Sequence, residues 1–216
     1  MIRAVTVAVI LLIGISSSRA NFLQSLFNTD FYQQVSSSFG AKGVARVQEW
    51  QQLIQEVQGA SDYVRLNRVN TFFNQNITYA NDIDHWNQKD YWATPVESLA
   101  TGSGDCEDYA IAKYVSLRAA GIPDEKLRMM YVRALRVNEP HMVLIYLQSE
   151  NAIPLVLDNM VSKVLPASRR ADLKPIYGFN AEGLWMAKAK GLGRKVEGRT
   201  GGTTWLNVLD RIEKGM

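Results

Sequence analysis

The stretch that most restricts how this chain can fold is residues 141–148, HMVLIYLQ, which is apolar on both of its alternating faces. The odd positions from 143 to 147 are Val, Ile and Leu, and the even positions from 142 to 146 are Met, Leu and Tyr. Successive side chains of a β-strand point to opposite faces of its sheet. A strand that is apolar on both faces is typical of the interior of a covered sheet. We therefore predict that residues 141–148 form a central strand.

Helical patterns come before this strand. The four predicted helices cover residues 43–57, 62–73, about 95–101 and about 105–120. The first two show apolar residues at helical spacing. The third has a strong start signal, with Thr94 as N-cap, Pro95 in the first turn and Glu97 completing a capping box. Gly121 closes the fourth helix, whose wide apolar face is expected of a buried central helix.

Strand patterns dominate the second half. Besides residues 141–148, the predicted strands are 77–79, 127–137, 152–160, 174–179 and 183–186. The short strand 77–79 lies in a segment, 74–92, that otherwise reads as irregular. The glycine-rich basic stretch 188–202 is typical of a solvated loop, and Thr203 or Thr204 is expected to cap a final helix. Helices followed by an antiparallel sheet define an α+β domain.

The first 20 residues have the layout of an export signal. Arg3 is followed by an apolar run over residues 4–15 and by small residues up to a cleavage site after Ala20. The alternative is a membrane anchor, but a spanning helix needs about 20 apolar residues and this run is shorter. We expect residues 1–20 to be removed and residues 21–216 to form one domain in the periplasm that does not span the membrane.

Composition excludes several classes of function. A formal net charge of +3 is too small to suggest nucleic acid as the main partner. One cysteine excludes an intramolecular disulfide framework and a zinc site with several thiolates. In an exported chain a solitary thiol is either buried and inert or present for its reactivity.

The surroundings of Cys106 favour reactivity. The residue follows a glycine-bearing turn and begins a helix, where unpaired N–H groups and the helix dipole stabilise a thiolate. A nucleophilic cysteine needs a base, and the chain has two histidines. His85 lies in an acidic irregular segment and is expected at the surface, whereas His141 begins the central strand.

The hairpin formed by residues 141–148 and 152–160 suggests a third member. If the connection is centred near Ser149 and Glu150, the residue opposite His141 is about 158, and residue 158 is Asp. Cross-strand partners on one face have Cβ atoms about 4.5–5.5 Å apart. Asp158 is therefore predicted to orient the ring of His141. The alternative is an unconnected set: a buried thiol, a strand-end histidine and a turn aspartate.

Carboxylates on both sides of the thiol complicate this interpretation. Asp105 and Glu107 oppose ionisation of Cys106 when they are uncompensated. One explanation is the ordinary preference for acidic residues at a helix start. The other is a divalent cation, because carboxylate oxygens suit Ca²⁺ and the cation would cancel their charge.

The motif at residues 102–109, GSGDCEDY, resembles that of the bacterial transglutaminase-like cysteine proteinases, in particular the LapG-type periplasmic proteases. The segments EPHMVL at 139–144 and LDN at 157–159 match in order and spacing. The resemblance covers about residues 50–185 and leaves the basic stretch 188–202 unexplained. It implies a papain-like, transglutaminase-like fold and peptide-bond hydrolysis.

The same resemblance implies roles for individual residues and partners. Cys106 would be the nucleophile, His141 the general base and acid, and Asp158 its orienter, with Asp105 and Glu107 as ligands of an activating Ca²⁺. The substrate would be a large surface adhesin, cut near its amino terminus at a paired-alanine site and released from the cell during biofilm dispersal. An inner-membrane cyclic di-GMP receptor would sequester the protease through its periplasmic domain.

Two other classes of function stay open on the sequence. The same three residues could serve a transglutaminase or an amidase acting on cell-wall peptides. A non-catalytic binding module on this fold is the other alternative, although such modules commonly lose one of the three residues.

Overall fold

The computed structural model describes residues 27–187, 193–196 and 201–215. The predicted export signal, residues 1–20, lies outside the described residues, as does most of the predicted loop 188–202. In the described part of the chain, none of the helices combines the length and the apolar character that crossing a membrane requires.

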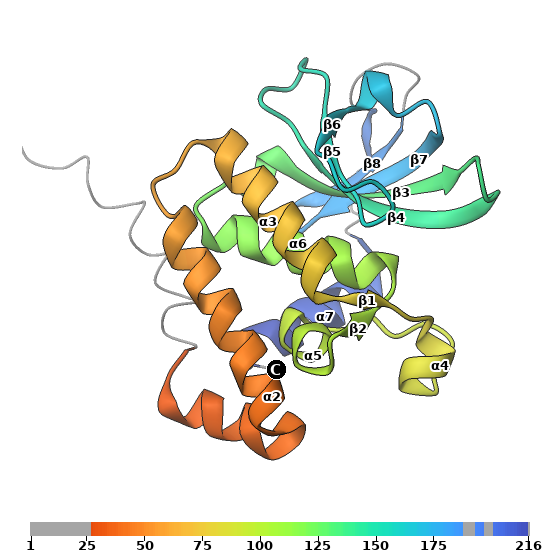
Figure 1. Ribbon diagram of the computed structural model, residues 1–216. Coiled ribbons are helices and arrows are strands. Elements are labelled where there is room, and N and C mark those ends of the chain that lie inside the picture. Colours follow the sequence, from red (N-terminus) through yellow and green to blue (C-terminus); the bar gives the residue numbers. More distant parts are fainter. Residues whose placement is uncertain (1–26, 188–192, 197–200, 216) are drawn as a thin grey trace, which may run out of the picture.

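The helices form one side of the molecule (Figure 1). They are α2 (Thr29–Val57), α3 (Asp62–Asn76), α4 (Asp82–Trp86), α5 (Pro95–Thr101), α6 (Cys106–Ala119) and α7 (Thr203–Glu213). The predicted helix 43–57 is the second half of α2, which is kinked at Gly40, where φ is +71°. The predicted helices 62–73, 95–101 and 105–120 correspond to α3, α5 and α6.

The ends of the helices show which local sequence signals predicted the helix boundaries correctly. Thr94 and Glu97 form the predicted capping box at the start of α5. The predicted cap of the final helix was wrong, because Gly202 occupies the N-cap position of α7 and neither threonine caps it. Residues 82–86 form a short helix where an irregular segment was expected.

The sheet has seven strands in the order β6-β5-β4-β3-β7-β8-β9, and all its neighbours are antiparallel. The strands are β3 (Leu127–Ala134), β4 (Glu139–Tyr146), β5 (Leu155–Leu157), β6 (Leu165–Pro166), β7 (Leu173–Asn180), β8 (Gly183–Met186) and β9 (Lys195–Val196). The predicted central strand is β4, which lies between β3 and β5. The predicted strand 152–160 is reduced to three residues.

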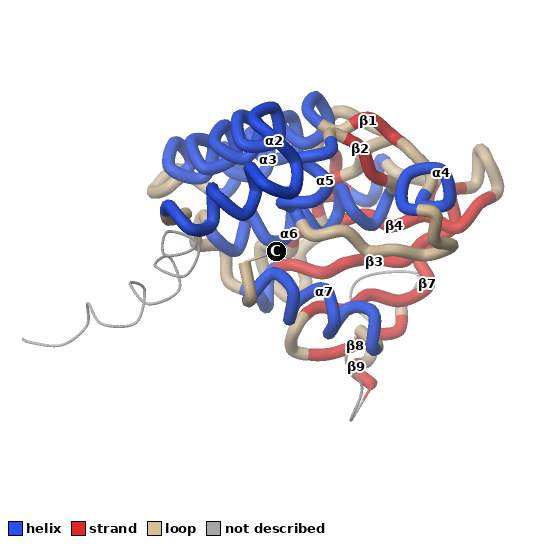
Figure 2. Tube along the Cα trace, turned by 90° about the horizontal axis from the view of Figure 1, so that it is seen from below, coloured by secondary structure: helices blue, strands red, loops and turns tan. Residues whose placement is uncertain are grey.

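The main core lies between the sheet and the helices. In both views the sheet stacks on the helices (Figures 1 and 2), with α6 packed against β4 and β3 and α3 packed against α6. Leu144 on β4 and Ile111 on α6 are fully buried in this core. The opposite face of β4 contributes Val143 and Ile145 to a second, smaller cluster. The first residue of α6, Cys106, lies against Met142 of β4.

Candidate active site

The turn that leads into Cys106 is held by backbone pairing. Strand β1 (Thr78–Tyr79) runs parallel to β2 (Ser103–Gly104). The Thr78 N–H donates to the Gly102 carbonyl at 2.9 Å, and the Ala80 N–H donates to the Gly104 carbonyl at 3.0 Å. Gly102 ends α5 at a φ of +75°, a conformation that glycine adopts without steric cost. This pairing fixes where α6 begins.

A buried carboxylate completes the turn. Asp108 is inaccessible to solvent and accepts hydrogen bonds from the backbone N–H groups of Ala93, at 2.7 Å, and Asp105, at 3.2 Å. A Cβ at position 104 would lie 2.7 Å from an Asp108 carboxylate oxygen, so only glycine fits there. Asp105 is the N-cap of α6, and Cys106 is its first residue.

His141 and Asp158 form a buried hydrogen-bonded pair. His141 Nε2 lies 2.8 Å from Asp158 Oδ1, and the two residues are 2% and 1% exposed. Their juxtaposition agrees with the expectation, but the register behind it was wrong. Leu144 pairs with Leu157, which extrapolates Asp158 to a position opposite Val143. The longer connection at 147–154 moves the register by two residues, and a shift of two keeps a side chain on the same face.

Cys106 lies beside the same strand. The backbone N–H of Met142, the residue after His141, donates to the Cys106 sulfur. His85 lies elsewhere, with its Nε2 3.1 Å from the Thr101 hydroxyl. Of the two histidines, His141 is therefore the one whose strand lies against the thiol.

Asp158 is held on every side. Its Oδ2 accepts a hydrogen bond from Arg170 at 2.6 Å, and its Oδ1 also accepts the Met160 N–H at 3.0 Å. Burial alone would raise the pKa of this carboxyl, but the hydrogen bonds from His141, Met160 and Arg170 lower the pKa to about 2. Asp158 is thus ionised at neutral pH and accepts from the N–H at Nε2 of His141, which leaves Nδ1 as the nitrogen that can exchange a proton.

The pKa of the Cys106 thiol is shifted in the opposite direction to that of Asp158. Burial raises the pKa of Cys106 well above its usual range, and the charge of Glu107, a hydrogen bond to Glu107 and the charge of Asp105 raise it further. The Cys106 S–H donates to a Glu107 carboxylate oxygen at 3.1 Å. Burial and these carboxylates therefore favour the protonated thiol, and a positive charge that compensates the carboxylates would favour its ionisation.

The same carboxylates form part of an acidic cluster. Carboxylate oxygens of Asp82, Asp105 and Asp108 lie within 4.8 Å of one another, and those of Asp82, Asp90 and Glu107 do so as well. One buried oxygen of Asp82 and one of Asp105 have no hydrogen-bond partner. Burial and then repulsion by Glu107 and Asp108 raise the pKa of Asp105 to about 9. Unpartnered oxygens crowded together suit a hard divalent cation.

Sequence reasoning named Asp105 and Glu107 here and missed Asp82 and Asp90. Asp82 comes from α4 and reaches the cluster only through folding, and its second oxygen accepts the Tyr91 N–H at 2.6 Å. Arg170 was also missed. An arginine in a polar segment between strands carries no local signal that its guanidinium will be buried against an aspartate.

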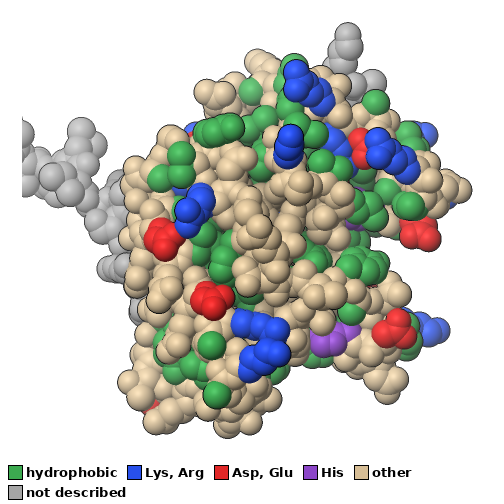
Figure 3. Space-filling model, in the orientation of Figure 1, with side chains coloured by type: hydrophobic (Ala, Val, Ile, Leu, Met, Phe, Trp, Pro, Cys, Tyr) green, Lys and Arg blue, Asp and Glu red, His purple; other side chains and the backbone are tan. Residues whose placement is uncertain are grey.

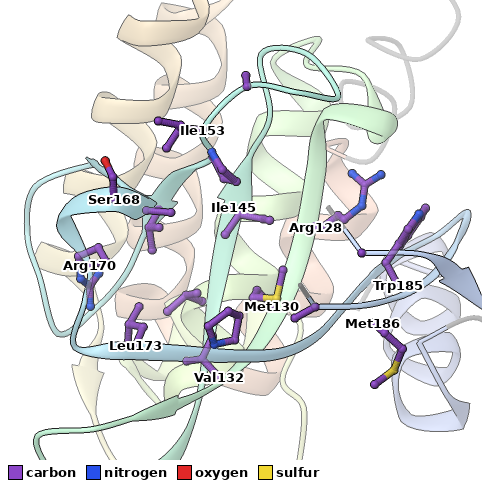
Figure 4. Close-up of a pocket in the computed structure, with 18 of the residues that line it drawn as sticks. Arg128, Met130, Val132, Ile145, Ile153, Ser168, Arg170, Leu173, Trp185 and Met186 are labelled. Carbon is purple, nitrogen blue, oxygen red and sulfur yellow. The ribbon is translucent and has the colours of Figure 1, made fainter. Parts of the chain in front are cut away.

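The surface is indented between the β3–β4 hairpin and α4, with hydrophobic side chains around the indentation (Figure 3). A separate cavity of about 560 Å³ lies over the second apolar cluster. Figure 4 shows Arg170 at one side of this cavity and Arg128 with Trp185 at the other. Arg170 therefore lines the cavity and contacts Asp158.

A helix that begins at a cysteine and packs on an antiparallel sheet bearing a His–Asp pair defines a papain-like, transglutaminase-like class of protein. The profile of the bacterial transglutaminase-like cysteine proteinases matches residues 41–172, and the chain belongs to that family. The resemblance seen in the sequence is thus confirmed, together with the α+β, transglutaminase-like fold.

Solved structures agree with this assignment. Calcium-bound LapG of Legionella pneumophila is 39% identical, with a TM-score of 0.72, over 85% of this chain and 98% of that chain. EGTA-treated LapG of the same organism is 38% identical, with the same TM-score, over 85% and 96% of the two chains. Comparison with curated proteins gives no match.

Proposed function

We propose that this chain is a cysteine endopeptidase in which Cys106 is the nucleophile, His141 the general base and acid, and Asp158 the orienter. The observation that carries the proposal is the placement of buried His141. Its Nε2 is hydrogen-bonded to Asp158, and the next residue of its strand, Met142, is hydrogen-bonded to the Cys106 sulfur. Membership of a cysteine proteinase family supports it.

The chemistry follows from the atoms in place. His141 Nδ1 takes the proton of the Cys106 thiol as the sulfur attacks the scissile carbonyl carbon. The Cys106 N–H belongs to the first turn of α6, whose N–H groups have no partner within the helix, and it would stabilise the developing oxyanion. The C–N bond breaks as the imidazolium gives its proton to the leaving amine. Water then attacks the carbonyl carbon of the thioester while His141 takes its proton. The C–S bond breaks to release the carboxylic acid, and the imidazolium returns the proton to the Cys106 sulfur.

Asp158 acts through His141. Its carboxylate accepts the N–H at Nε2, so the basic lone pair is on Nδ1, and its charge stabilises the imidazolium. Because Arg170 and the Met160 N–H keep Asp158 ionised, this orientation persists across the neutral pH range.

The site also fits calcium. Asp105 and Glu107 would hold the ion, joined by Asp82, whose buried oxygen lacks a partner. When bound, the ion supplies positive charge that offsets the carboxylates opposing ionisation of Cys106. Asp108 is committed to two backbone N–H groups. The calcium-bound and EGTA-treated forms of the related LapG support this assignment.

The proposed substrate is the amino-terminal region of a large surface adhesin, cut at a paired-alanine site, with release of the adhesin and dispersal of biofilm. The proposed regulator is the periplasmic domain of an inner-membrane cyclic di-GMP receptor, and the proposed location is the periplasm. The similarity to LapG over most of the chain supports this choice over cell-wall peptides.

The decisive experiment incubates the purified protein, with Ca²⁺ and a fluorescent primary amine, with the amino-terminal fragment of the adhesin. A discrete cut at a paired alanine, absent in the Cys106→Ala variant, is the expected result. Incorporation of the amine without a cut would instead indicate a transglutaminase. Binding without either product would indicate a non-catalytic module.

A further inference from the structure

Lys113 is a buried lysine that the proposed chemistry does not use. It lies on α6 seven residues after Cys106, which on an α-helix is almost two full turns and about 10.5 Å along the same face. Its side chain is inaccessible to solvent. Full burial of a lysine is unusual unless its ammonium group is paired.

The partner of Lys113 connects it to Asp158. Lys113 Nζ donates to Asn74 Oδ1 on α3 at 2.7 Å, and Asn74 Nδ2 donates to the main-chain carbonyl of Asp158 at 2.8 Å. The ammonium also lies over the ring of Tyr109, 5.6 Å from its centroid. A continuous hydrogen-bonded link therefore runs from the helix that begins at Cys106, through α3, to the backbone of Asp158.

This link is a poor way to gain stability. Burial lowers the pKa of Lys113 to about 7, which reflects the cost of withdrawing the ammonium from water. Replacing buried charged groups by apolar side chains of similar volume is often neutral or stabilising. Geometry offers the better explanation, because β5 ends at Leu157 and no strand pairing holds Asp158 itself.

We infer that Lys113 and Asn74 are positioning residues, which fix Asp158 relative to α6 so that its carboxylate meets the ring of His141 while that ring faces Cys106. The inference rests on the proposed function, since it assigns the link to the same site. Arg170 and Met160 orient the carboxylate group, whereas the Lys113–Asn74 link places the backbone that carries it.

The chain supplies a matched control. Asn70 lies one helical turn before Asn74 on α3, is fully buried whereas Asn74 is half-buried, and donates from Nδ2 to the Ser162 carbonyl at 2.8 Å. Both asparagines therefore tie α3 to the segment after β5. Only Asn74 reaches Asp158.

The test compares Lys113→Met and Asn74→Leu with Asn70→Leu in saturating Ca²⁺. For each protein, kcat, KM, the thermal midpoint and the rate of Cys106 alkylation by iodoacetamide are measured. We expect kcat to fall about 10- to 100-fold in the first two variants. A loss of this size is typical when reacting groups are misplaced by about 1 Å. KM should stay within twofold, alkylation should slow, and the midpoint of Lys113→Met should be unchanged or higher.

Two results would overturn the inference. One is wild-type kcat and alkylation in both Lys113→Met and Asn74→Leu. The other is a loss of kcat in Asn70→Leu as large as that in Asn74→Leu, which would indicate general loosening of the segment. Alkylation needs no substrate, so it decides the role of the link even if the wild-type protein cuts no adhesin, a failure that would count against the proposed function alone.

Discussion

Arg170 Nη2 lies 2.6 Å from Asp158 Oδ2, and the two side chains are 3% and 0% exposed. Arg170 Nη2 also lies 2.8 Å from Asp172 Oδ2, and the side chain of Asp172 is 20% exposed. Asp158 thus meets an imidazole at one oxygen and a permanent cation at the other. A carboxylate held in this way stays charged and has little freedom to rotate, which is what an orienting residue requires.

Replacing Arg170 should therefore damage both stability and turnover. Arg170→Gln leaves Asp158 buried without its cation, and breaking a buried pair in this way costs about 3–5 kcal/mol. We expect a lower free energy of unfolding in urea and a lower kcat. Arg170→Lys should recover only part of both, because an ammonium cannot reproduce the two-carboxylate contact of the guanidinium.

Asp172 provides the control for this prediction. Asp172→Asn removes the more exposed partner of Arg170 and leaves the Asp158 pair in place, so kcat should stay close to the wild-type value. Equal losses in Asp172→Asn and Arg170→Gln would contradict a specific role for the Asp158 contact.

Asp158→Asn isolates the carboxylate charge. The amide keeps the shape of the side chain but does not favour the tautomer with its lone pair on Nδ1, and it cannot stabilise the imidazolium. By analogy with serine triads, we expect kcat to fall on the order of 10²–10⁴-fold. Steady-state cleavage rates provide the measurement, and an unchanged rate would exclude the orienting role.

The lowered pKa of Asp158 also predicts a dependence of stability on pH. The carboxyl titrates at about 2 in the folded protein and near its ordinary value of 3.8 when unfolded. Its contribution, about 2 kcal/mol, is therefore complete above about pH 5 and is lost as the pH falls through 3.8 toward 2. Urea unfolding of the wild type should weaken over this window, and Asp158→Asn should show a shallower slope. Parallel slopes would contradict the shift.

Cys106→Ala should abolish turnover without loss of the fold. Alanine is the most favourable residue for a helix, and Cys106 is only partly buried at the first position of α6. The far-ultraviolet circular dichroism and thermal midpoint should match the wild type, while cleavage disappears. If the variant keeps a tenth of the wild-type rate, Cys106 is not the nucleophile.

Local signals predicted the parts of the site that depend on neighbours in sequence. The glycine turn before Cys106 and the apolar alternation of β4 depend on residues a few positions apart, so helix start and central strand followed directly. Asp158 was placed beside His141 despite a register wrong by two residues, because a shift of two preserves the face of a strand.

The remaining parts depend on contacts between distant segments. Asp82 joins the acidic cluster because α4 packs near the start of α6, and Lys113 meets Asn74 because α3 packs on α6. Aspartate, asparagine and lysine are ordinary surface residues, so nothing in the local sequence distinguishes these copies. Only the packing of the helices, which is set by their buried apolar faces, brings them to the site.

Removal of calcium should silence cleavage. Without the ion, burial and the charges of Glu107 and Asp105 hold the pKa of the thiol high, so little thiolate forms. We expect excess EGTA to abolish cleavage of the adhesin fragment and added Ca²⁺ to restore it. Mg²⁺ should substitute poorly, because it retains its waters and demands a tight octahedron. Full cleavage in EGTA, with metal absence confirmed by elemental analysis, would exclude the calcium assignment.

The ligand variants separate charge from geometry. Asp105→Asn with Glu107→Gln removes the proposed ligands and also the charges that oppose ionisation of Cys106. If charge were the whole effect, this double variant would cleave without calcium. We expect it to be inactive with or without the ion, because an ion shared with Asp82 would also fix the turn that aims the sulfur.

Asp82→Asn tests the added ligand. It should raise the Ca²⁺ concentration needed for half-maximal cleavage while leaving the rate at saturation close to the wild-type value. An unchanged calcium requirement in Asp82→Asn would remove Asp82 from the site.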